Sequence, residues 1–313
     1  MLYPIISLVL GLIVLVWSAD KFVFGAAGTA KNLGMSPLLI GLTIVSFGTS
    51  APEILVSIMA TLDDSGTLAI GNAIGSNIAN IALVLGVTAL IAPLPVSSTV
   101  KNKEMPLMLG VTVIAGTLLF NLQLTIIDSI ILFTALVISL VIFAKFQQKD
   151  DSNDDDDIPT ISTATGIIWF IIGLILLIAS SKALVWGATQ IATSLGVSQL
   201  VIGLTIVAIG TSLPELAASI MSALKGQHDI AIGNVIGSNI FNLGAVMTIP
   251  GLASTIDLQH DVFYRDYLLM LALSALLLTF CFLRKPAKIK RLEGSVFVAI
   301  YTAYMAVLYF TAI

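Results

Sequence analysis

Long hydrophobic runs dominate the chain, and short polar segments separate them. Ten of these runs are each about 20 residues long, which is enough to cross the hydrocarbon core of a bilayer. They cover residues 4–26, 37–62, 67–91, 105–121, 124–146, 164–188, 197–224, 229–253, 263–283 and 294–312. The pattern therefore predicts an all-α membrane protein with ten transmembrane helices.

The composition agrees with this interpretation. Apolar residues make up 58% of the 313 positions, charged residues only 10%, and the mean hydropathy is +1.05. A soluble domain of this length needs many more charges on its surface, so the lipid bilayer is the expected environment and no nucleic-acid partner is expected. The net charge of −4 carries little further information, because the charged residues lie between the hydrophobic runs.

The second half of the chain repeats the first. A shift of 162 residues aligns 38–86 with 200–248 without a gap, and 27 of the 49 aligned pairs are identical. Such similarity indicates an internal duplication, with one five-helix repeat at 1–147 and another at 164–313. The segment between them, 148–163, contains KDDSNDDDDIPT and is too polar to enter lipid.

An odd number of helices in each repeat makes the two repeats enter the membrane from opposite sides. If the N-terminus lies outside, twelve of the fourteen basic residues fall on the cytoplasmic side, and only Lys182 and Arg265 fall outside. This distribution follows the positive-inside rule. We therefore expect a multi-pass protein of the cell membrane, with both termini outside and the linker 148–163 in the cytoplasm.

Each repeat places a glutamate inside a membrane-spanning run, although one charge at a helix centre costs about 2.5–3.5 kcal/mol. The spacing of the polar residues around each glutamate puts them on one face of a helix. In the first repeat this face holds Thr43, Ser46, Ser50, Glu53 and Ser57. In the second repeat it holds Thr205, Ala208, Ser212, Glu215 and Ser219.

A proline precedes each glutamate and should disturb the helix. Pro52 and Pro214 cannot donate a backbone hydrogen bond, and their rings crowd the preceding turn. The carbonyl groups that lose their partners belong to Gly48, Thr49, Gly210 and Thr211. Such carbonyl groups are tolerated at membrane depth where something else satisfies them, and a metal ion does so. The alternative is a kink that serves only packing.

The next hydrophobic run of each repeat supplies a second polar face. The matching sequences are GNAIGSNIAN at 71–80 and GNVIGSNIFN at 233–242. Asn72, Ser76 and Asn80 are four residues apart, as are Asn234, Ser238 and Asn242, so each set lies on one helix face. Of these residues, Ser76, Asn80, Ser238 and Asn242 are candidate ligands. The glycine pairs of the same sequences are better explained by close helix packing.

The candidate ligands are carboxylates, amides, hydroxyls and carbonyls, without a histidine, cysteine or methionine among them. Hard oxygen donors suit alkali and alkaline-earth ions rather than zinc or copper. Mg²⁺ retains its waters and prefers few protein ligands, so a crowded oxygen cage favours Ca²⁺ or Na⁺. Two carboxylates supply a charge of about −2, which one Ca²⁺ or several Na⁺ can neutralise.

The motifs GTSAPE with GNAIGSNIAN, and GTSLPE with GNVIGSNIFN, resemble the repeats of the cation/calcium antiporter family, in its sodium/calcium exchanger branch. The resemblance covers nearly the whole chain. It implies that Glu53 and Glu215 bind Ca²⁺ together with the carbonyl groups of Thr49 and Thr211. It assigns the sodium sites to Ser50, Ser76, Ser212 and Ser238, with the backbone at Ser46 and Ala208. Asn80 and Asn242 complete the centre.

The short linker lacks the large regulatory calcium-binding domains of animal exchangers, which is typical of a prokaryotic form. The resemblance implies a sodium/calcium antiporter that works by alternating access. We expect it to act as a monomer without a cofactor.

Three other functions compete with this prediction. A calcium/proton antiporter is the nearest alternative, because a buried glutamate can be neutralised by a proton as well as by Na⁺. A calcium channel agrees less well with an enclosed site between inverted repeats. An enzyme is not expected, because the two histidines, His228 and His260, fall at loops away from the oxygen-rich faces.

Overall fold

The computed structural model describes residues 2–147, 161–196 and 208–312. The first part of the chain forms α1 (Leu2–Asn32), α2 (Pro37–Ile40), η1 (Gly41–Val45), α3 (Ser46–Thr49), α4 (Ala51–Leu62), α5 (Gly66–Ala79), η2 (Asn80–Leu85), α6 (Gly86–Ile91), β1 (Leu94–Pro95), η3 (Val100–Glu104), α7 (Met105–Leu119), β2 (Gln123–Leu124) and α8 (Ile126–Gln147). The second part forms α9 (Thr163–Ser194), α11 (Ala208–Thr211), α12 (Leu213–Leu224), α13 (His228–Phe241), η6 (Asn242–Val246), α14 (Thr248–Ala253), β3 (Ile256–Asp257), η7 (Val262–Tyr267), α15 (Leu268–Leu283), β4 (Lys288–Ile289) and α16 (Arg291–Ala312).

The protein is a helical membrane protein. Within the described ranges, seven helices are long and apolar enough to cross a bilayer, and an eighth span is the bent pair Pro37–Thr49 and Ala51–Leu62. Of the remaining predicted spans, 105–121 contains α7, which has 15 residues and follows the π-helical turn η3. The span at 197–224 is described only from residue 208, and most of the linker 148–163 also lies outside the described residues.

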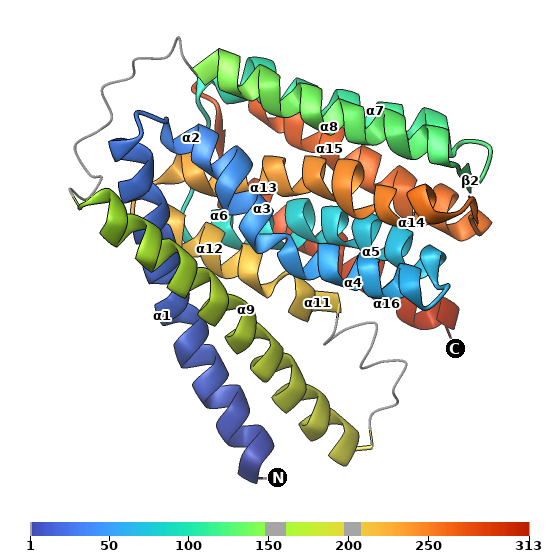
Figure 1. Cartoon of the computed structure of the whole chain (residues 1–313), viewed down its shortest axis with the longest axis horizontal. Helices are drawn as coiled ribbons and strands as arrows, with labels where there is room; N and C mark the ends of the chain where they lie inside the picture. Colours follow the sequence, from blue (N-terminus) through green and yellow to red (C-terminus); the bar gives the residue numbers. More distant parts are fainter. Residues whose placement is uncertain (1, 148–160, 197–207, 313) are drawn as a thin grey trace.

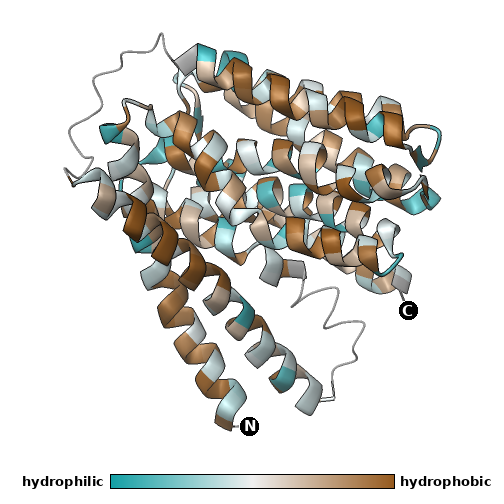
Figure 2. Cartoon of the chain, viewed as in Figure 1, coloured by the Kyte–Doolittle hydropathy of each residue, from teal (hydrophilic) through white to brown (hydrophobic). Residues whose placement is uncertain are grey.

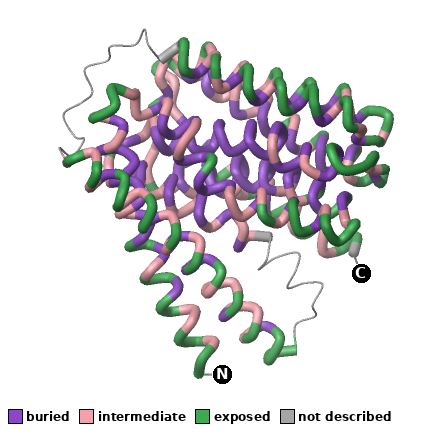
Figure 3. The backbone as a smooth tube through the Cα atoms, viewed as in Figure 1, coloured by how far each residue is buried: buried purple, intermediate pink, exposed green. Residues whose placement is uncertain are grey.

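The two spans that carry the GN–GSN motifs form the centre of the molecule. In the spans Gly66–Ile91 and His228–Ala253, 72% and 94% of the most apolar window is buried, against 17–33% in the other long spans. Figure 3 shows this buried centre surrounded by helices with exposed outer faces. Those outer faces, on α1, α8 and α9, carry exposed leucine, isoleucine and valine side chains, and Figure 2 shows their hydrophobic character. Lipid tails are the natural neighbours of such faces.

Helices α1 and α9 form a pair of their own. They lie side by side along most of their length and extend beyond the central helices (Figure 1). Glycines permit the close approach: a Cβ atom built on Gly173 would lie 2.7 Å from Cα of Phe22, and one built on Gly25 would lie 2.9 Å from Cα of Phe170. The larger of the two buried apolar clusters in the described residues contains no residue of α1 or α9.

The glutamate-bearing helix is not continuous. The axis turns by 43° between Pro37–Thr49 and Ala51–Leu62, at Ser50, whose ψ of 4° departs from helical geometry. Pro52 lies in the first turn of α4, where a missing N–H costs nothing. The second repeat has the same break at Ser212, with Pro214 in the first turn of α12. The face predicted for a straight helix is therefore distributed over two helical segments.

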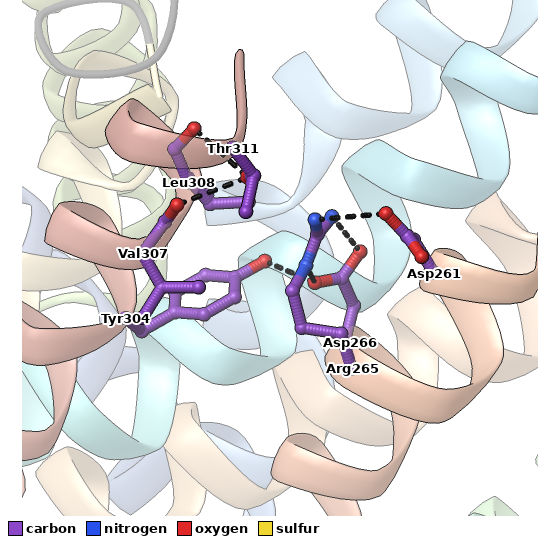
Figure 4. Close-up of polar contacts among 7 residues, drawn as sticks. All are labelled: Asp261, Arg265, Asp266, Tyr304, Val307, Leu308 and Thr311. Carbon is purple, nitrogen blue, oxygen red and sulfur yellow. Dashed lines mark hydrogen bonds and ion pairs between the residues drawn. The ribbon is translucent and has the colours of Figure 1, made fainter. Parts of the chain in front are cut away.

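Two short strand pairs connect the repeats at their loops. β1 pairs antiparallel with β4, and β2 pairs antiparallel with β3. Near β3, Arg265 bonds both oxygens of Asp266, at 2.7 and 3.0 Å, and reaches Asp261 at 3.4 Å (Figure 4). Tyr304 of α16 also donates to Asp266, at 3.0 Å. This cluster neutralises Arg265 and joins η7 to α16.

Candidate functional site: a paired-carboxylate cage

Each of the two glutamates lies directly after a helix break. Glu53 lies in the first turn of α4 and Glu215 in the first turn of α12, and each residue is 1% exposed. The unpaired N–H groups at a helix N-terminus favour a negative charge there. The Ser50 hydroxyl, from the break in the first repeat, donates to Oε1 of Glu215 at 3.5 Å. The carboxylate of one repeat is thus in contact with the break of the other.

Several buried oxygens of this region have no hydrogen-bond partner. They are Oε2 of Glu53, Oε2 of Glu215, Oγ of Ser212, Oγ of Ser238 and Oδ1 of Asn242. A buried polar group without a partner costs about 1–3 kcal/mol, and more when it is charged. Carboxylate, hydroxyl and amide oxygens of this kind are the donors that a dehydrated Ca²⁺ or Na⁺ ion prefers.

The other predicted ligands lie in the same buried centre. Ser46, Thr49, Ser50, Ser76 and Asn80 are all buried. Thr211 is half-buried, and Ala208 is the first residue of α11, with its side chain outside the described part. Asn80 and Asn242 each begin a π-helical turn, η2 and η6. Such turns occur frequently at functional sites, because they interrupt the regular backbone hydrogen bonding.

Asn234 connects the two repeats beside the glutamates. The Thr49 hydroxyl donates to Oδ1 of Asn234 at 3.0 Å, while Nδ2 of Asn234 donates to Oγ of Ser219 at 3.0 Å and to the carbonyl of Glu215 at 3.4 Å. This amide was not among the predicted ligands. The sequence signal for it was its place on the second polar face, four residues before Ser238 and equivalent to Asn72.

Asn77 is a second residue that sequence reasoning missed. Its Oδ1 accepts a hydrogen bond from Nδ2 of Asn242 at 3.0 Å, and its own Nδ2 donates to the carbonyl of Asn239 at 3.1 Å. The residue is 1% exposed. Its signal was the repeated GSN sequence, which cannot distinguish a ligand from a residue that holds one.

A cavity of about 650 Å³ lies between α4, α9 and α11. Its lining includes Asp63, Lys182 and Trp186, and it reaches Gly210 and Thr211 at the break of the second repeat. Ser181 of α9 donates to the carbonyl of Gly210 at 2.9 Å. The cavity therefore extends from the C-terminal end of α4 to a carbonyl-bearing segment that the sequence analysis predicted to belong to the cation site.

The fold and the buried carboxylate pair define an ion-transporting membrane protein. The profile of the family described as sodium/calcium exchanger protein matches residues 3–145 and 165–310. The chain belongs to the sodium/calcium exchanger family. It is accordingly a sodium/calcium antiporter, and the calcium/proton alternative is not favoured.

Individual relatives agree with this assignment. The chain is 43% identical to the putative antiporter CaxA of Alkalimonas amylolytica, with 99% of each chain covered. It is 32% identical to the sodium/calcium exchanger MaX1 of Methanosarcina acetivorans, with 97% of each covered. A solved structure of the sodium-calcium exchanger NCX_Mj superimposes with a TM-score of 0.85 and 33% identity, covering 97% of this chain and 98% of that one.

Proposed function

We propose that Ca²⁺ and Na⁺ compete for the cage around Glu53 and Glu215, and that the protein exposes this cage alternately to the two sides of the membrane. The observation that supports this best is the pair of glutamates, each 1% exposed, surrounded by buried oxygens without partners. Two carboxylates at membrane depth are costly unless cations normally neutralise them. Competition for the same negative charge couples the two ions.

The residues divide by the ion that they hold. Glu53 and Glu215 bind Ca²⁺ with the backbone carbonyls of Thr49 and Thr211, one from each helix break. Sodium ions take the surrounding oxygens. Those oxygens belong to Ser46, Ser50, Ser76, Ala208, Ser212 and Ser238, of which Ser46 and Ala208 contribute backbone carbonyls. Asn80 and Asn242 occupy the centre, where each begins a π-helical turn.

Charge balance explains why the ions exchange rather than bind together. One Ca²⁺ neutralises the two carboxylates, and several Na⁺ ions do the same. Binding of Ca²⁺ and of several Na⁺ ions at the same time would leave excess positive charge in a medium of low dielectric constant. Moving Ca²⁺ out of a cell against about 100 mV costs roughly 4.6 kcal/mol before any concentration gradient, since each elementary charge costs about 2.3 kcal/mol. Inward movement of Na⁺ supplies that energy.

The arrangement that we propose is ten spans in two inverted five-helix repeats, 1–147 and 164–313. The strand pairs support it. β1 follows the third span of the first repeat and β4 follows the fourth span of the second, whereas β2 and β3 have the reciprocal positions. Inverted repeats bring each of these pairs to one side of the membrane, and repeats of equal orientation would separate them.

The orientation places both termini outside and the linker 148–163 in the cytoplasm, in agreement with the twelve basic residues on that side. The cavity beside Asp63 and Lys182 is then the extracellular access to the cage. The transport unit is a single chain, because residues of its two repeats complete the cage between them.

The test is calcium uptake into proteoliposomes that contain the purified protein. We expect rapid ⁴⁵Ca²⁺ uptake into vesicles loaded with Na⁺ and diluted into Na⁺-free buffer, and no uptake when the loading ion is K⁺. A pH gradient without Na⁺ should not replace the sodium gradient. Equal uptake with K⁺-loaded vesicles, or uptake that a pH gradient alone supports, would contradict the proposal.

A further inference from the structure

The amide of Asn77 has its orientation fixed by its surroundings. Its Nδ2 faces two atoms that can only accept hydrogen bonds, the carbonyl oxygen of Asn239 at 3.1 Å and the thioether sulfur of Met270 at 3.4 Å. The opposite arrangement would place Oδ1 against both acceptors and lose both bonds. Oδ1 of Asn77 must therefore face Asn242.

This orientation determines the orientation of the next amide. Because Oδ1 of Asn77 needs a donor, Asn242 presents Nδ2 to it, at 3.0 Å. The remaining polar atom of Asn242, Oδ1, then points the other way, where it is buried and has no hydrogen-bond partner. The two ends of an asparagine amide have nearly the same shape, so the surrounding hydrogen bonds alone decide which end faces a neighbour.

We propose that Asn77 is a positioning residue of the cation cage: it holds Asn242 so that an oxygen, and never an NH₂ group, faces the bound cation. The inference rests on the proposed function, in which Asn242 belongs to the cage. Asn77 itself donates its protons away from the cage. An NH₂ group in place of the Asn242 oxygen would repel a cation, and outer residues that orient metal ligands commonly change affinity about 10–100-fold when they are removed.

The second repeat provides a matched control at the equivalent residue, Asn239. It is as buried as Asn77, at 2% exposure, but its Nδ2 donates to the carbonyl of Val235 in its own helix at 2.7 Å. No hydrogen bond recorded between described residues joins the Asn239 side chain to Asn80. Asn77 and Asn239 therefore occupy equivalent positions in the two motifs but make different hydrogen bonds.

The experiment measures equilibrium binding of ⁴⁵Ca²⁺ to the purified protein and its displacement by Na⁺. We expect Asn77→Leu to raise the half-saturating concentration of Ca²⁺, Na⁺ or both by about tenfold or more, and Asn239→Leu to raise them less. In the Asn77→Leu background, Asn242→Asp should recover affinity, because a carboxylate presents oxygen at either end. In the parental background the same change places an oxygen against Oδ1 of Asn77 and should not tighten binding.

Equal effects of Asn77→Leu and Asn239→Leu, or the same effect of Asn242→Asp in both backgrounds, would overturn the assignment. If Asn77→Leu does not fold, Asn77→Ala leaves room for a water molecule that can donate or accept, and it should weaken binding in the same way. Failure of both variants to fold would show that Asn77 supports the fold instead. A parental protein that binds no Ca²⁺ would contradict the proposed function and not this assignment alone.

An independent observation concerns an ion pair at the C-terminal end of α12, whereas the cavity lies near the N-terminal end of this helix. Lys225, directly after α12, lies 2.7 Å from Oδ1 of Asp20 in α1, and its Nζ also donates to the Asp20 carbonyl at 3.1 Å. Lys21 lies 3.3 Å from the same carboxylate. The pair joins the α1–α9 pair to the central helices.

The repeat relation maps this ion pair onto a second one with exchanged charges. A shift of 162 residues takes Asp20 to Lys182, and it takes Asp63 to Lys225. Asp63 and Lys182 both line the cavity of about 650 Å³, and both are exposed. No ion pair joins these two described residues. Because the acid and the base are exchanged together, Asp63 and Lys182 are still oppositely charged and can form the equivalent ion pair.

We propose that the two pairs are latches that engage in turn. Asp20–Lys225 is closed in the conformation whose cavity lies open at Asp63 and Lys182. The change to the other conformation would open the first pair and close the second. α1 contacts the central helices through the smaller apolar cluster, which includes Ile40, Val45 and Ala218, and neither α1 nor α9 belongs to the larger cluster.

The latches predict opposite effects for two equivalent substitutions. A partly exposed ion pair contributes little free energy, so each change should alter the balance of the two conformations by about fivefold at most. Asp20→Asn should destabilise the conformation in which the Asp20–Lys225 pair is closed. Asp63→Asn should destabilise the conformation in which the Asp63–Lys182 pair is closed. The combined variant should return towards the parental balance.

Thiol labelling of a Val56→Cys reporter in the cavity lining measures the open fraction, and the buried Cys281 does not compete. We expect Asp20→Asn to slow labelling, Asp63→Asn not to slow it, and the exchanged pair Asp20→Lys with Lys225→Asp to restore the parental rate. Slower labelling in both single variants, no change in either, or failure of the exchanged pair would overturn the latches. Labelling needs no transport, so the result does not depend on the proposed function.

Discussion

The GN–GSN segments of the two repeats share their polar residues and glycines but not their environments. A Cβ atom built on Gly233 would lie 2.9 Å from the Leu38 carbonyl, and one built on Gly237 would lie 2.8 Å from Cβ of Ser46, so η1 and its neighbours pack directly on α13. The glycines of α13 therefore permit close packing between the two repeats.

The environments of the two repeats differ at the cage. Thr49 is buried and bonded to Asn234, whereas Thr211 borders the cavity and is half-buried. Asn234 is fully buried with its amide satisfied, whereas Nδ2 of the half-buried Asn72 has no partner. A transporter that opens to one side of the membrane at a time needs the two halves of its site to differ in exposure. The two repeats supply these halves.

The largest expected effect should be the same in both repeats. Glu53→Gln and Glu215→Gln keep the side-chain shape and remove one charge from the cage. Breaking a buried charge interaction costs roughly 3–5 kcal/mol, so Ca²⁺ affinity should fall more than about a hundredfold in either variant. Sodium-driven ⁴⁵Ca²⁺ uptake, normalised to folded protein, checks this. Parental exchange by either variant would eliminate the paired-carboxylate cage.

The next effect should separate the repeats. Asn234→Ala removes the partner of Thr49 and Ser219 inside the protein, and we expect a loss of stability of about 1–3 kcal/mol. Asn72→Ala removes an amide with an unpaired Nδ2 and should change stability by less than about 0.5 kcal/mol. Thermal unfolding of both variants in detergent without Ca²⁺ measures the difference. Equal losses would mean that the asymmetry of the two amides has no energetic consequence.

Glycine substitution tests the close packing of α13. In Gly237→Ala the added methyl group meets the Leu42 carbonyl and the Ser46 side chain, and overpacking of this kind costs about 1–3 kcal/mol. The unfolding temperature of this variant should therefore fall. A variant that unfolds at the parental temperature would contradict the close contact between α13 and η1.

The smallest effect concerns access and leaves the fold unchanged. A thiol reagent added to the purified protein should modify Thr211→Cys, which borders the cavity, faster than Thr49→Cys, which is buried. Each substitution is nearly isosteric. Comparable rates at the two positions would show that the cavity does not give selective access to the second repeat.

Much of this protein could be predicted from the order of its residues. The membrane environment was predictable because hydrophobic length reports directly on the bilayer. The repeated glutamates, serines and asparagines were predictable as a group, because buried polar residues at helical spacing have few uses in lipid. The burial of Glu53, Ser76 and Asn80, and of their equivalents in the second repeat, is consistent with that group.

The roles of Asn77 and Asn234, which were not among the predicted ligands, could not be obtained from residue type and spacing. Asn77 and Asn239 are equivalent in sequence, but one bonds across the repeats and the other bonds its own helix. Asn234 bonds Thr49 of the other repeat, whereas Nδ2 of Asn72 has no partner. Nothing in a local motif states which copy will be buried by helices from the other half of the chain.

What the sequence determined by itself is the chemistry: a hydrophobic chain, duplicated, with hard oxygen ligands at membrane depth. Those properties follow from residue type and spacing, which act over a few turns of helix. Only the tertiary structure decided which amides bond across the repeats, which oxygens lack partners and which of the two exchanged charge pairs is formed. These depend on contacts between residues more than 150 positions apart, such as Asp20 with Lys225 and Thr49 with Asn234, for which |i−j| is 205 and 185. Packing in three dimensions selects one arrangement from two that the duplicated sequence permits.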